Sequence, residues 1–442
     1  MLRPMARRQQ THPPSSDQPP TRDWPQTVVG TKYLRLLEQQ IQGLRDKHSH
    51  GNRDLFLDDV FVLSLLAFHN PALRSLRILE DFSQSTQAQR QLTVDRIPRS
   101  TLSDFHKLAD PERLRPLVEA LREQLVRKQV LRDNRDPLAT LLQRVLAVDG
   151  TWMTAMTDVL WAVVARNQHA PPTKKHRARI DFQVDVRTLI PEIIAIPDPG
   201  ESESASAARH IQPGCIHVYD RGFSSFPLIA AHYDRDPAVA ADGLPEAWTT
   251  KAEFVIRYKP AGGNSPELQG PVERPLTDAD RAAGVVSDRT GTFRSSKPGR
   301  HVVPPVTLRE VVIETVENGQ TSTLRLITNL LDLPAAAIGL VYRQRWQVEL
   351  FFRWLKSVWN FRHLVSHNRE GLLTQMYVTL IGVMLMYLHT GYRPSKYMLA
   401  MLSIGAELDE ILPILRERER QCEVARQSAA RRAAAKKAAK NS

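Results

Sequence analysis

The segment from Leu340 to Val358 separates polar and apolar side chains onto two sides of a predicted helix. Four polar residues fall within about 60° of arc at 100° per residue: Tyr342, Arg345, Glu349 and Lys356. The apolar residues fall on the far side: Leu340, Val348, Phe351, Leu355 and Val358. The pattern predicts a helix that buries one side in a core and directs a carboxylate, two cations and a phenol into a cleft.

A carboxylate among cations suits chemistry on a phosphate backbone. The acid holds a divalent cation, and the basic side chains hold phosphate oxygens. An ordinary amphipathic helix with ion pairs three and four residues apart explains the same spacing equally well. The choice between the two interpretations depends on whether further carboxylates accompany Glu349.

Two further carboxylates are predicted at the ends of buried strands. Asp149 follows the apolar run Val145–Val148 and precedes Gly150, as at a strand that stops in a turn. Asp220 continues one face of a predicted strand that begins at Ile216. A single Asp after a strand is usually a turn or helix-cap residue, so neither acid is informative by itself.

Together, the three acids follow the order strand, strand, helix. Three carboxylates brought within several ångströms of one another repel strongly unless protons or cations neutralise them, so the group implies Mg²⁺ or Mn²⁺. Two such ions about 3.5–4 Å apart activate an attacking oxygen and stabilise a leaving one in line. The sequence therefore predicts metal-dependent phosphodiester chemistry.

The four polar residues of the predicted helix also match a known signature. The spacing Tyr, two residues, Arg, three residues, Glu, six residues, Lys resembles that of bacterial insertion-sequence DDE transposases of the YREK type, a cut-and-paste class. The segments VDGT at Asp149 and DRGF at Asp220 are similar to the first and second acidic motifs of that family. The resemblance covers residues 141–390.

The resemblance implies a fold and a catalytic centre. The expected fold is α/β, with a ribonuclease-H-like catalytic domain that is interrupted by a β-rich insertion. An all-α N-terminal domain and a basic C-terminal helical tail flank this domain in our interpretation of the sequence. The resemblance implies that Asp149, Asp220 and Glu349 are the catalytic residues and the ligands of two Mg²⁺ or Mn²⁺ ions.

The same resemblance implies contacts to DNA. Tyr342, Arg345 and Lys356 would hold phosphates of the transposon ends near the metals, and Arg221, beside the second acid, is a further candidate. The expected partner is double-stranded DNA, both the inverted-repeat ends of the element and the target. A homodimer on DNA is expected because two ends are cut as a pair.

The sequence departs from the family pattern at one point. Family members that excise through a DNA hairpin place a Trp in the β insertion to stack on a flipped base, but no Trp occurs between Trp248 and Trp346. Stacking needs only a flat π face, so three other aromatic residues are candidates for this role: Phe254, Tyr258 and Phe293. The hairpin intermediate is therefore an open question at this stage.

Composition shifts and periodicity divide the chain into six parts. They are a disordered tail at 1–30, a helical domain at 31–132, a first catalytic segment at 138–259, a β-rich insertion with its return strand at 260–329, a second catalytic segment with the active-site helix at 330–392, and a C-terminal helix with a basic tail at 393–442.

Within the helical domain, LRILEDFSQ and IPRSTLSDFHKL form a candidate helix-turn-helix for DNA ends, with Ser100 or Thr101 as the cap. An ordinary helical bundle is the preferred alternative.

Two acids outside the motif are rivals for the site. Glu201 and Glu203 begin a predicted helix that continues to His210. The helix dipole alone favours acids in a first turn, so this explanation is preferred over a catalytic role.

Charge and composition favour a polyanionic partner in the cytoplasm. The formal net charge is +12, and the tail from Val424 to Ser442 contains six basic residues and no acid. Charge alone does not separate nucleic acid from an anionic membrane surface, but neither a lipid anchor nor a secretory signal is recognised. The apolar run Tyr377–Leu388 is shorter than the roughly 20 residues that span a bilayer, so a buried helix is expected. Two cysteines fit a reducing, nucleoid-associated location in a bacterium.

These expectations combine into one functional hypothesis. The chain is predicted to be a transposase that cleaves DNA at transposon ends in a metal-dependent reaction and transfers the strands into target DNA. Two alternatives stay open: a nuclease of the same fold without strand transfer, and a DNA-binding protein of the same fold without catalysis.

Overall fold

The computed structural model of the chain divides into two compact units. A helical unit comprises Met1–Gln124 and Thr374–Ser442, and a sheet unit comprises Leu125–Leu373. The structure describes residues 22, 24, 31–45, 55–68, 75–127, 144–154, 163–164, 176–235, 248–258, 268–293, 304–317, 320–358, 368–403 and 408–441. The sheet unit ends at Leu373 and the helical unit resumes at Thr374, inside the segment 330–392 that was predicted to belong to the catalytic domain.

Every described element of the helical unit is a helix. Its amino-terminal part contains α1 (Thr31–Leu36), α2 (Glu38–Gln42), α3 (Leu57–Phe68), α4 (Leu76–Ser83), α5 (Thr86–Gln89), α6 (Arg99–Leu108), the 3₁₀ helix η1 (Pro111–Leu114) and α7 (Arg115–Arg127). Its carboxyl-terminal part contains α14 (Arg369–Thr390), α15 (Lys396–Ser403) and α16 (Leu408–Asn441). Apolar residues at helical spacing are buried in this unit, among them Leu34, Leu37, Ile41 and Leu44.

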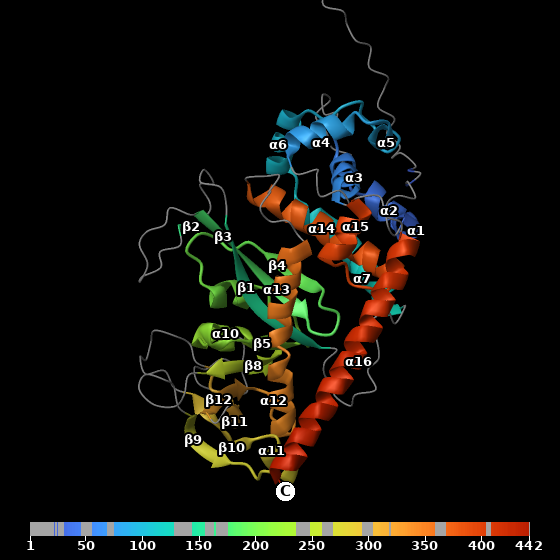
Figure 1. The fold of residues 1–442 in the computed structure, drawn as a ribbon. Helices are drawn as coiled ribbons and strands as arrows, with labels where there is room; N and C mark the ends of the chain where they lie inside the picture. The colour runs from blue at the N-terminus through green and yellow to red at the C-terminus, as the bar shows by residue number, and fades with distance from the viewer. Residues whose placement is uncertain are drawn as a thin grey trace, which may run out of the picture. The chain divides into compact units, whose positions relative to one another are not determined.

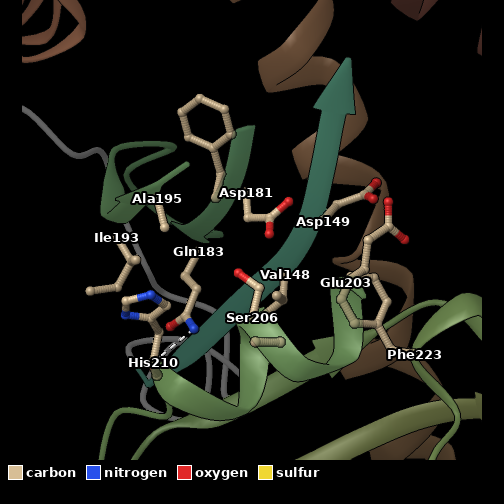
Figure 2. Close-up of a pocket in the computed structure, with 12 residues that line it drawn as sticks. Val148, Asp149, Asp181, Gln183, Ile193, Ala195, Glu203, Ser206, His210 and Phe223 are labelled. Carbon is tan, nitrogen blue, oxygen red and sulfur yellow. Dashed lines mark hydrogen bonds between the residues drawn. The ribbon is translucent and has the colours of Figure 1, made fainter. Parts of the chain in front are cut away.

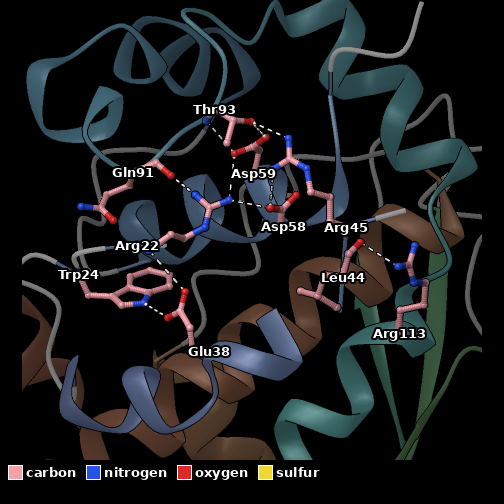
Figure 3. Close-up of polar contacts among 10 residues, drawn as sticks. All are labelled: Arg22, Trp24, Glu38, Leu44, Arg45, Asp58, Asp59, Gln91, Thr93 and Arg113. Atoms are coloured by element: carbon pink, nitrogen blue, oxygen red, sulfur yellow. Dashed lines mark hydrogen bonds and ion pairs between the residues drawn. The ribbon is translucent and has the colours of Figure 1, made fainter. Parts of the chain in front are cut away.

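A buried ion network holds Arg22 against α3 (Figure 3). Its Nη2 donates to Asp58 Oδ2 at 2.8 Å and to Asp59 Oδ1 at 3.1 Å. Arg45 Nη1 donates to the same Asp58 oxygen at 3.1 Å. Buried carboxylates are tolerated when cations pair with them in this way. Two residues in the range 1–30, where the sequence predicts a disordered tail, are therefore buried in the folded unit: Arg22 and Trp24.

The candidate helix-turn-helix contains an additional helix. α4 contacts α6, but α5 lies between them along the chain, whereas the turn of such a motif usually has three or four residues. α6 begins at Arg99 with Pro98 as its N-cap, and no side chain caps it, so the predicted cap at Ser100 or Thr101 is wrong. A role for α6 in recognising DNA ends stays a prediction.

The apolar run near Tyr377 forms part of α14. Among the described residues, α14 is the helix whose length and composition would suffice to cross a bilayer, but 83% of its most apolar stretch is buried. Burial of this kind is typical of a core helix. The predicted buried helix at Tyr377–Leu388 is confirmed.

The sheet unit is built on a mixed sheet with ten strands in its described part (Figure 1). The strands are β1 (Val145–Thr154), β2 (Val163–Val164), β3 (His176–Asp185), β4 (Pro191–Ala195), β5 (Ile216–Tyr219), β8 (Glu253–Tyr258), β9 (Leu268–Glu273), β10 (Val285–Phe293), β11 (Leu308–Glu317) and β12 (Gln320–Thr328). Their order is β2-β3-β1-β5-β8-β12-β11-β10-β9, with β4 paired to β3. β6 (Tyr233–Arg235) and β7 (Trp248–Thr250) form a separate pair.

Helices connect and cover this sheet. They are α9 (Glu203–Arg209), the 3₁₀ helix η2 (Arg221–Phe223), α10 (Phe226–Ala231), α11 (Asp278–Ala282), α12 (Ala335–Arg343) and α13 (Trp346–Val358). The middle strands β1, β5 and β8 are parallel to one another, and their apolar residues are buried on both faces, as is usual for parallel strands. The α/β class expected from the sequence is confirmed, with a large central sheet.

Antiparallel pairs surround the parallel strands, and the predicted insertion joins the main sheet. β3 pairs with β4, and β11 pairs with β12 as a hairpin in which Glu317 faces Gln320. β12 also pairs with β8, so the strands between residues 260 and 329 extend the central sheet at one edge.

Arg309 fastens this extension to the start of α12. Its guanidinium donates to both Asp288 oxygens, at 2.8 and 2.7 Å, and both side chains are almost fully buried. The same guanidinium donates to the carbonyls of Leu330 and Leu331, at 3.1 and 3.2 Å. These bonds satisfy backbone acceptors that precede α12 and hold the chain where the helix begins.

Two local predictions are wrong. The single active-site helix predicted between Leu340 and Val358 is two helices, because tight backbone bonds such as Arg345 N to Tyr342 O close a turn between α12 and α13. β1 does not stop at Asp149: it continues through Gly150, which pairs with Asp181. The antiparallel partner β3 sustains β1 after its parallel partner has ended.

We predict that Arg309→Ala lowers the free energy of unfolding by about 3–5 kcal/mol, because the buried Asp288 carboxylate loses both of its guanidinium hydrogen bonds and keeps only the longer contact with Arg274. Chemical denaturation of the full chain measures this change. Arg274→Ala is the control, since the Arg274 Nε contacts the same carboxylate at 3.6 Å from a side chain that is 36% exposed; it is expected to cost less than about 1 kcal/mol. Equal losses in the two variants would contradict the role given to Arg309.

Candidate catalytic site

Strand register brings the first two acids together. β1 and β5 are parallel, and the last pair in their register is Val148 with Tyr219. Asp149 and Asp220 each follow a member of this pair, so they leave the sheet at the same edge and from neighbouring strands. The sequence predicted that both acids end strands; the structure shows that Asp149 ends the parallel pairing and not the strand.

Packing of α13 on β3 brings the third acid to the same edge. Phe351 and Phe352 of α13 each lie edge-on to Phe182, with ring centroids 5.5 Å apart. Phe182 is the antiparallel partner of Asp149, so both side chains lie on the sheet face that α13 covers. Glu349 precedes both aromatic residues on α13, and the Arg345 guanidinium that it binds also lies 4.0 Å from Asp149 Oδ2.

Arg345 provides the positive charge that the three acids share. Its Nη2 donates to Glu349 Oε1 at 2.7 Å, and its Nη1 lies 4.0 Å from Asp149 Oδ2. Asp220 lies within electrostatic range of the same guanidinium. The three predicted acids are thus gathered around one cation. In the described part of the chain, however, no three acidic, His or Cys side chains approach closely enough to hold a metal ion as they stand.

Burial makes the Asp149 carboxylate unusually basic. The pKa of Asp149 is raised to about 6, mainly by burial and also by the neighbouring Glu203 and Asp220 carboxylates, although the Gly150 N–H and Arg345 oppose the shift. The Gly150 N–H donates to Asp149 Oδ1 at 2.8 Å. The desolvated, repelling carboxylate favours either a proton or a cation.

The residues present suit a hard divalent cation. Asp220 Oδ1 is buried and accepts no hydrogen bond, which leaves a lone pair directed at no donor. Carboxylate oxygens are the ligands that Mg²⁺ and Mn²⁺ prefer. Asp149 and Asp220 would hold such an ion at the sheet edge, with Glu349 opposite them.

The residues that are predicted to contact DNA differ in how far they are buried. Tyr342 is buried, and burial raises the pKa of its phenol, although Arg345 and Arg257 oppose the shift. Arg221 is exposed in η2, one residue after Asp220. Lys356 belongs to α13, but its side chain lies outside the described part of the structure.

The structure also places acids at the site that the sequence analysis did not select. A pocket beside β1 is lined by Asp149, Asp181 and Glu203, among others (Figure 2). Asp181 is held by Arg179, whose Nε donates to its Oδ1 at 2.9 Å. Glu203 was considered as a rival acid but assigned to the helix dipole. The signal that would have found it is Gly150 directly after Asp149, because a glycine leaves room for another carboxylate.

The aromatic candidates for base stacking are not accessible. All three are at most 5% exposed and belong to the core of the sheet unit: Phe254, Tyr258 and Phe293. The suggestion that one of them replaces the family's Trp is therefore wrong. Trp346 is 50% exposed at the start of α13, with the Arg353 guanidinium 5.3 Å from its ring centroid.

The family and the curated proteins that match this chain are all described as transposases. The family described as "Transposase DDE domain" matches residues 140–385, more than half of the chain. A putative transposase, y4zB, from Sinorhizobium fredii (strain NBRC 101917 / NGR234) is 29% identical over 207 residues, which is 47% of each chain. A probable transposase for insertion sequence element IS5377 from Geobacillus stearothermophilus is 36% identical over 76 residues, 17% of this chain and 20% of that protein. The chain thus matches about half of the first relative's length and a fifth of the second's.

A solved structure is similar at low identity. It is a piggyBac transposase synaptic complex with hairpin DNA, with 13% identity and a TM-score of 0.36 over 85% of this chain and 76% of that one. A score this low carries no argument about the site.

We predict that Asp149→Asn stabilises the metal-free protein above pH 6. The folded-state pKa of about 6 exceeds the usual 3.8, so the wild type loses stability as pH rises from about 4 to about 6. Asn does not titrate, and the variant should gain of the order of 1–3 kcal/mol over the wild type at pH 8. Denaturation in EDTA between pH 4 and 8 measures the gap; a gap that does not grow with pH would contradict the prediction.

Proposed function

Because the chain belongs to the DDE transposase family, we propose that it cleaves DNA at the ends of its own element and joins those ends to target DNA. Members of this family generally use divalent metal ions. The observation that carries the proposal is the convergence of Asp149, Asp220 and Glu349 on the Arg345 guanidinium. Three acids from two strands and a helix that share one cation are what a phosphodiester-cleaving centre requires before its metal binds.

The sheet supports a ribonuclease-H-like core. Strands β4-β3-β1-β5-β8 run in sequence across one half of the sheet, with β1, β5 and β8 parallel. We assign the core to these five strands and treat β12-β11-β10-β9 as the β-rich insertion. On this assignment both aspartates lie at the carboxyl edge of the central strands, where open α/β sheets commonly bind ligands.

The acids would hold two Mg²⁺ or Mn²⁺ ions, which supply Lewis acidity and a polarised oxygen when bound. Asp149 and Asp220 would hold them from the sheet edge and Glu349 from α13. The Arg345 guanidinium would have to leave its place between Asp149 and Glu349, since it occupies the region that the three carboxylates face. A DNA phosphate is the natural new partner for this guanidinium, because it is an equivalent oxygen acceptor.

The reaction has two displacements at phosphorus. A water oxygen attacks the phosphate at the transposon end, and the departing 3′ oxygen takes up a proton to become a hydroxyl. That hydroxyl attacks a target phosphate and displaces a target 3′ oxygen, so no bond energy is needed from a nucleotide cofactor. Tyr342, Arg345, Lys356 and Arg221 would position the phosphates for both steps.

The wider setting follows from the same proposal. The partners are the inverted-repeat ends and target DNA, and paired cutting favours a homodimer assembled on DNA. The formal charge of +12 suits a polyanionic partner in a bacterial cytoplasm. The exposed Trp346, three residues before Glu349, is the accessible aromatic face closest in sequence to the proposed catalytic acid.

We predict that Glu349→Gln abolishes metal-dependent cleavage of an end-containing duplex but leaves end binding within about threefold of wild type. The change removes one ligand charge and no backbone contact. Gel assays of cleavage, strand transfer and binding separate the steps, and Glu314→Gln, an exposed acid on β11, is the control. A variant that still cuts would remove Glu349 from catalysis.

The wild-type protein in the same assays separates the alternative functions. Cleavage without strand transfer would indicate a nuclease. Binding without cleavage would indicate a DNA-binding protein of the same fold without catalysis.

We predict that Lys356→Ala weakens end binding and reduces the dependence of log K on log salt by about 0.9, the value for one lost phosphate contact. Filter binding between 50 and 300 mM salt, about the usual range for such a slope, measures this change. Arg281→Ala, which removes an equal charge from the exposed α11, should leave the slope unaltered. Identical slopes for the wild type and Lys356→Ala would exclude the phosphate contact.

A further inference from the structure

Glu203 is the first residue of α9, and its carboxylate lies between the two segments that follow the catalytic aspartates. A Cβ added to Gly150 would lie 2.8 Å from Asp181 Oδ1 and 3.3 Å from Glu203 Oε1, whereas a Cβ added to Gly222 would make only an ordinary contact, 3.8 Å from Glu203 Oε2. Gly150 follows Asp149 directly, and Gly222 is two residues after Asp220. The absence of a side chain at Gly150 therefore leaves the space in which the Asp181 and Glu203 carboxylates lie, and the Glu203 carboxylate also reaches the neighbourhood of Gly222.

The other acids near Glu203 each have a cation of their own. Asp181 accepts two bonds from Arg179, at 2.9 and 3.2 Å. Glu201 accepts two bonds from Arg209, at 2.9 and 2.6 Å. Throughout the described part of the chain, by contrast, no hydrogen bond or ion pair holds the Glu203 carboxylate; Arg179 attracts it only at longer range.

An unpaired carboxylate here is electrostatically unfavourable. Asp149 and Asp220 both repel Glu203, and Arg345 contacts Glu349 and Asp149 without a contact to Glu203. Asp220 Oδ1 is likewise buried with no donor. Two carboxylates that lack partners and face the same edge of the sheet indicate that a cation belongs between them.

The helix dipole is an insufficient explanation for this acid. A first-turn Glu is favoured by the dipole wherever its side chain points. The dipole does not account for the close approach to Gly150, nor for the position of Glu203 on the lining of the pocket that Asp149 also lines (Figure 2).

We propose that Glu203 is a fourth carboxylate of the catalytic centre, which helps Asp149 and Asp220 to bind the divalent cation, directly or through a bound water. The inference rests on the proposed function, because it assumes that the cation binds at Asp149 and Asp220. It assigns Glu203 to the side of the centre opposite Glu349, so that acids from α9 and α13 approach the sheet edge from two directions.

The test measures binding of Mn²⁺ to the full chain without DNA, by the electron paramagnetic resonance signal of free Mn²⁺. Glu203→Gln should raise the Mn²⁺ dissociation constant by about 10–100-fold, as losses of supporting ligands typically do. Glu201→Gln is the matched control: the same change two residues away, at an acid bound to Arg209, should leave the constant within about twofold of wild type.

A shorter acid separates coordination from a structural role. Glu203→Asp keeps the charge at the start of α9 but withdraws the carboxylate by one methylene. If Glu203 acts on the metal, this variant also binds Mn²⁺ at least several-fold more weakly, with an unchanged melting temperature in EDTA. If Glu203→Asp binds like the wild type, the carboxylate acts only through α9 and the proposal is overturned, even where Glu203→Gln proves unstable.

Asp149→Asn distinguishes failure of this inference from failure of the proposed function. Weak binding by Asp149→Asn together with wild-type binding by Glu203→Gln would refute the role of Glu203 and leave the catalytic assignment intact. Wild-type binding by Asp149→Asn would refute the assumption that the cation binds at the sheet edge, and the inference would fall with it.

Discussion

The parallel register of β1 and β5 is the constraint on which the candidate site depends. Because Val148 pairs with Tyr219, Asp149 and Asp220 emerge from neighbouring strands at one level of the sheet. Hydrogen bonding of the backbone enforces this proximity, and it overcomes the repulsion between two acids. A shift of one residue in either strand would move one aspartate to the other sheet face and separate the pair.

The helices complete what the strands begin. Phe351 and Phe352 pack on Phe182, so the position of Glu349 depends on apolar contacts and not on the charges at the site. The turn between α12 and α13 places Arg345 where it reaches both Glu349 and Asp149. The acids are thus held by the fold, and their charge is balanced by a side chain that is able to move.

The strands beyond β8 contribute to the site indirectly. Arg309 and Asp288 form a buried ion pair that also binds carbonyls before α12, and Asp280 Oδ1 accepts the Ala336 N–H at 2.8 Å in the first turn of that helix. Bonds from the extended sheet therefore hold the amino-terminal end of α12, the helix that carries Tyr342. The region predicted as an insertion is in this sense part of the support for the catalytic edge.

The sequence by itself determined the residue types and the order of the site. Local patterns identified Asp149, Asp220 and Glu349 and the amphipathic face around Val348 and Phe351, because hydrophobic periodicity and motif spacing are properties of short segments. Only the tertiary structure decided that β1 continues past Asp149, that the helix breaks at Arg345, and that the Glu203 carboxylate lies beside Gly150. The first and the last of these depend on a partner far away along the chain, namely the pairing with β3 and the close approach of α9, whereas the break is a turn of local backbone bonds that apolar spacing does not reveal. Spacing within one segment carries no information about such partners.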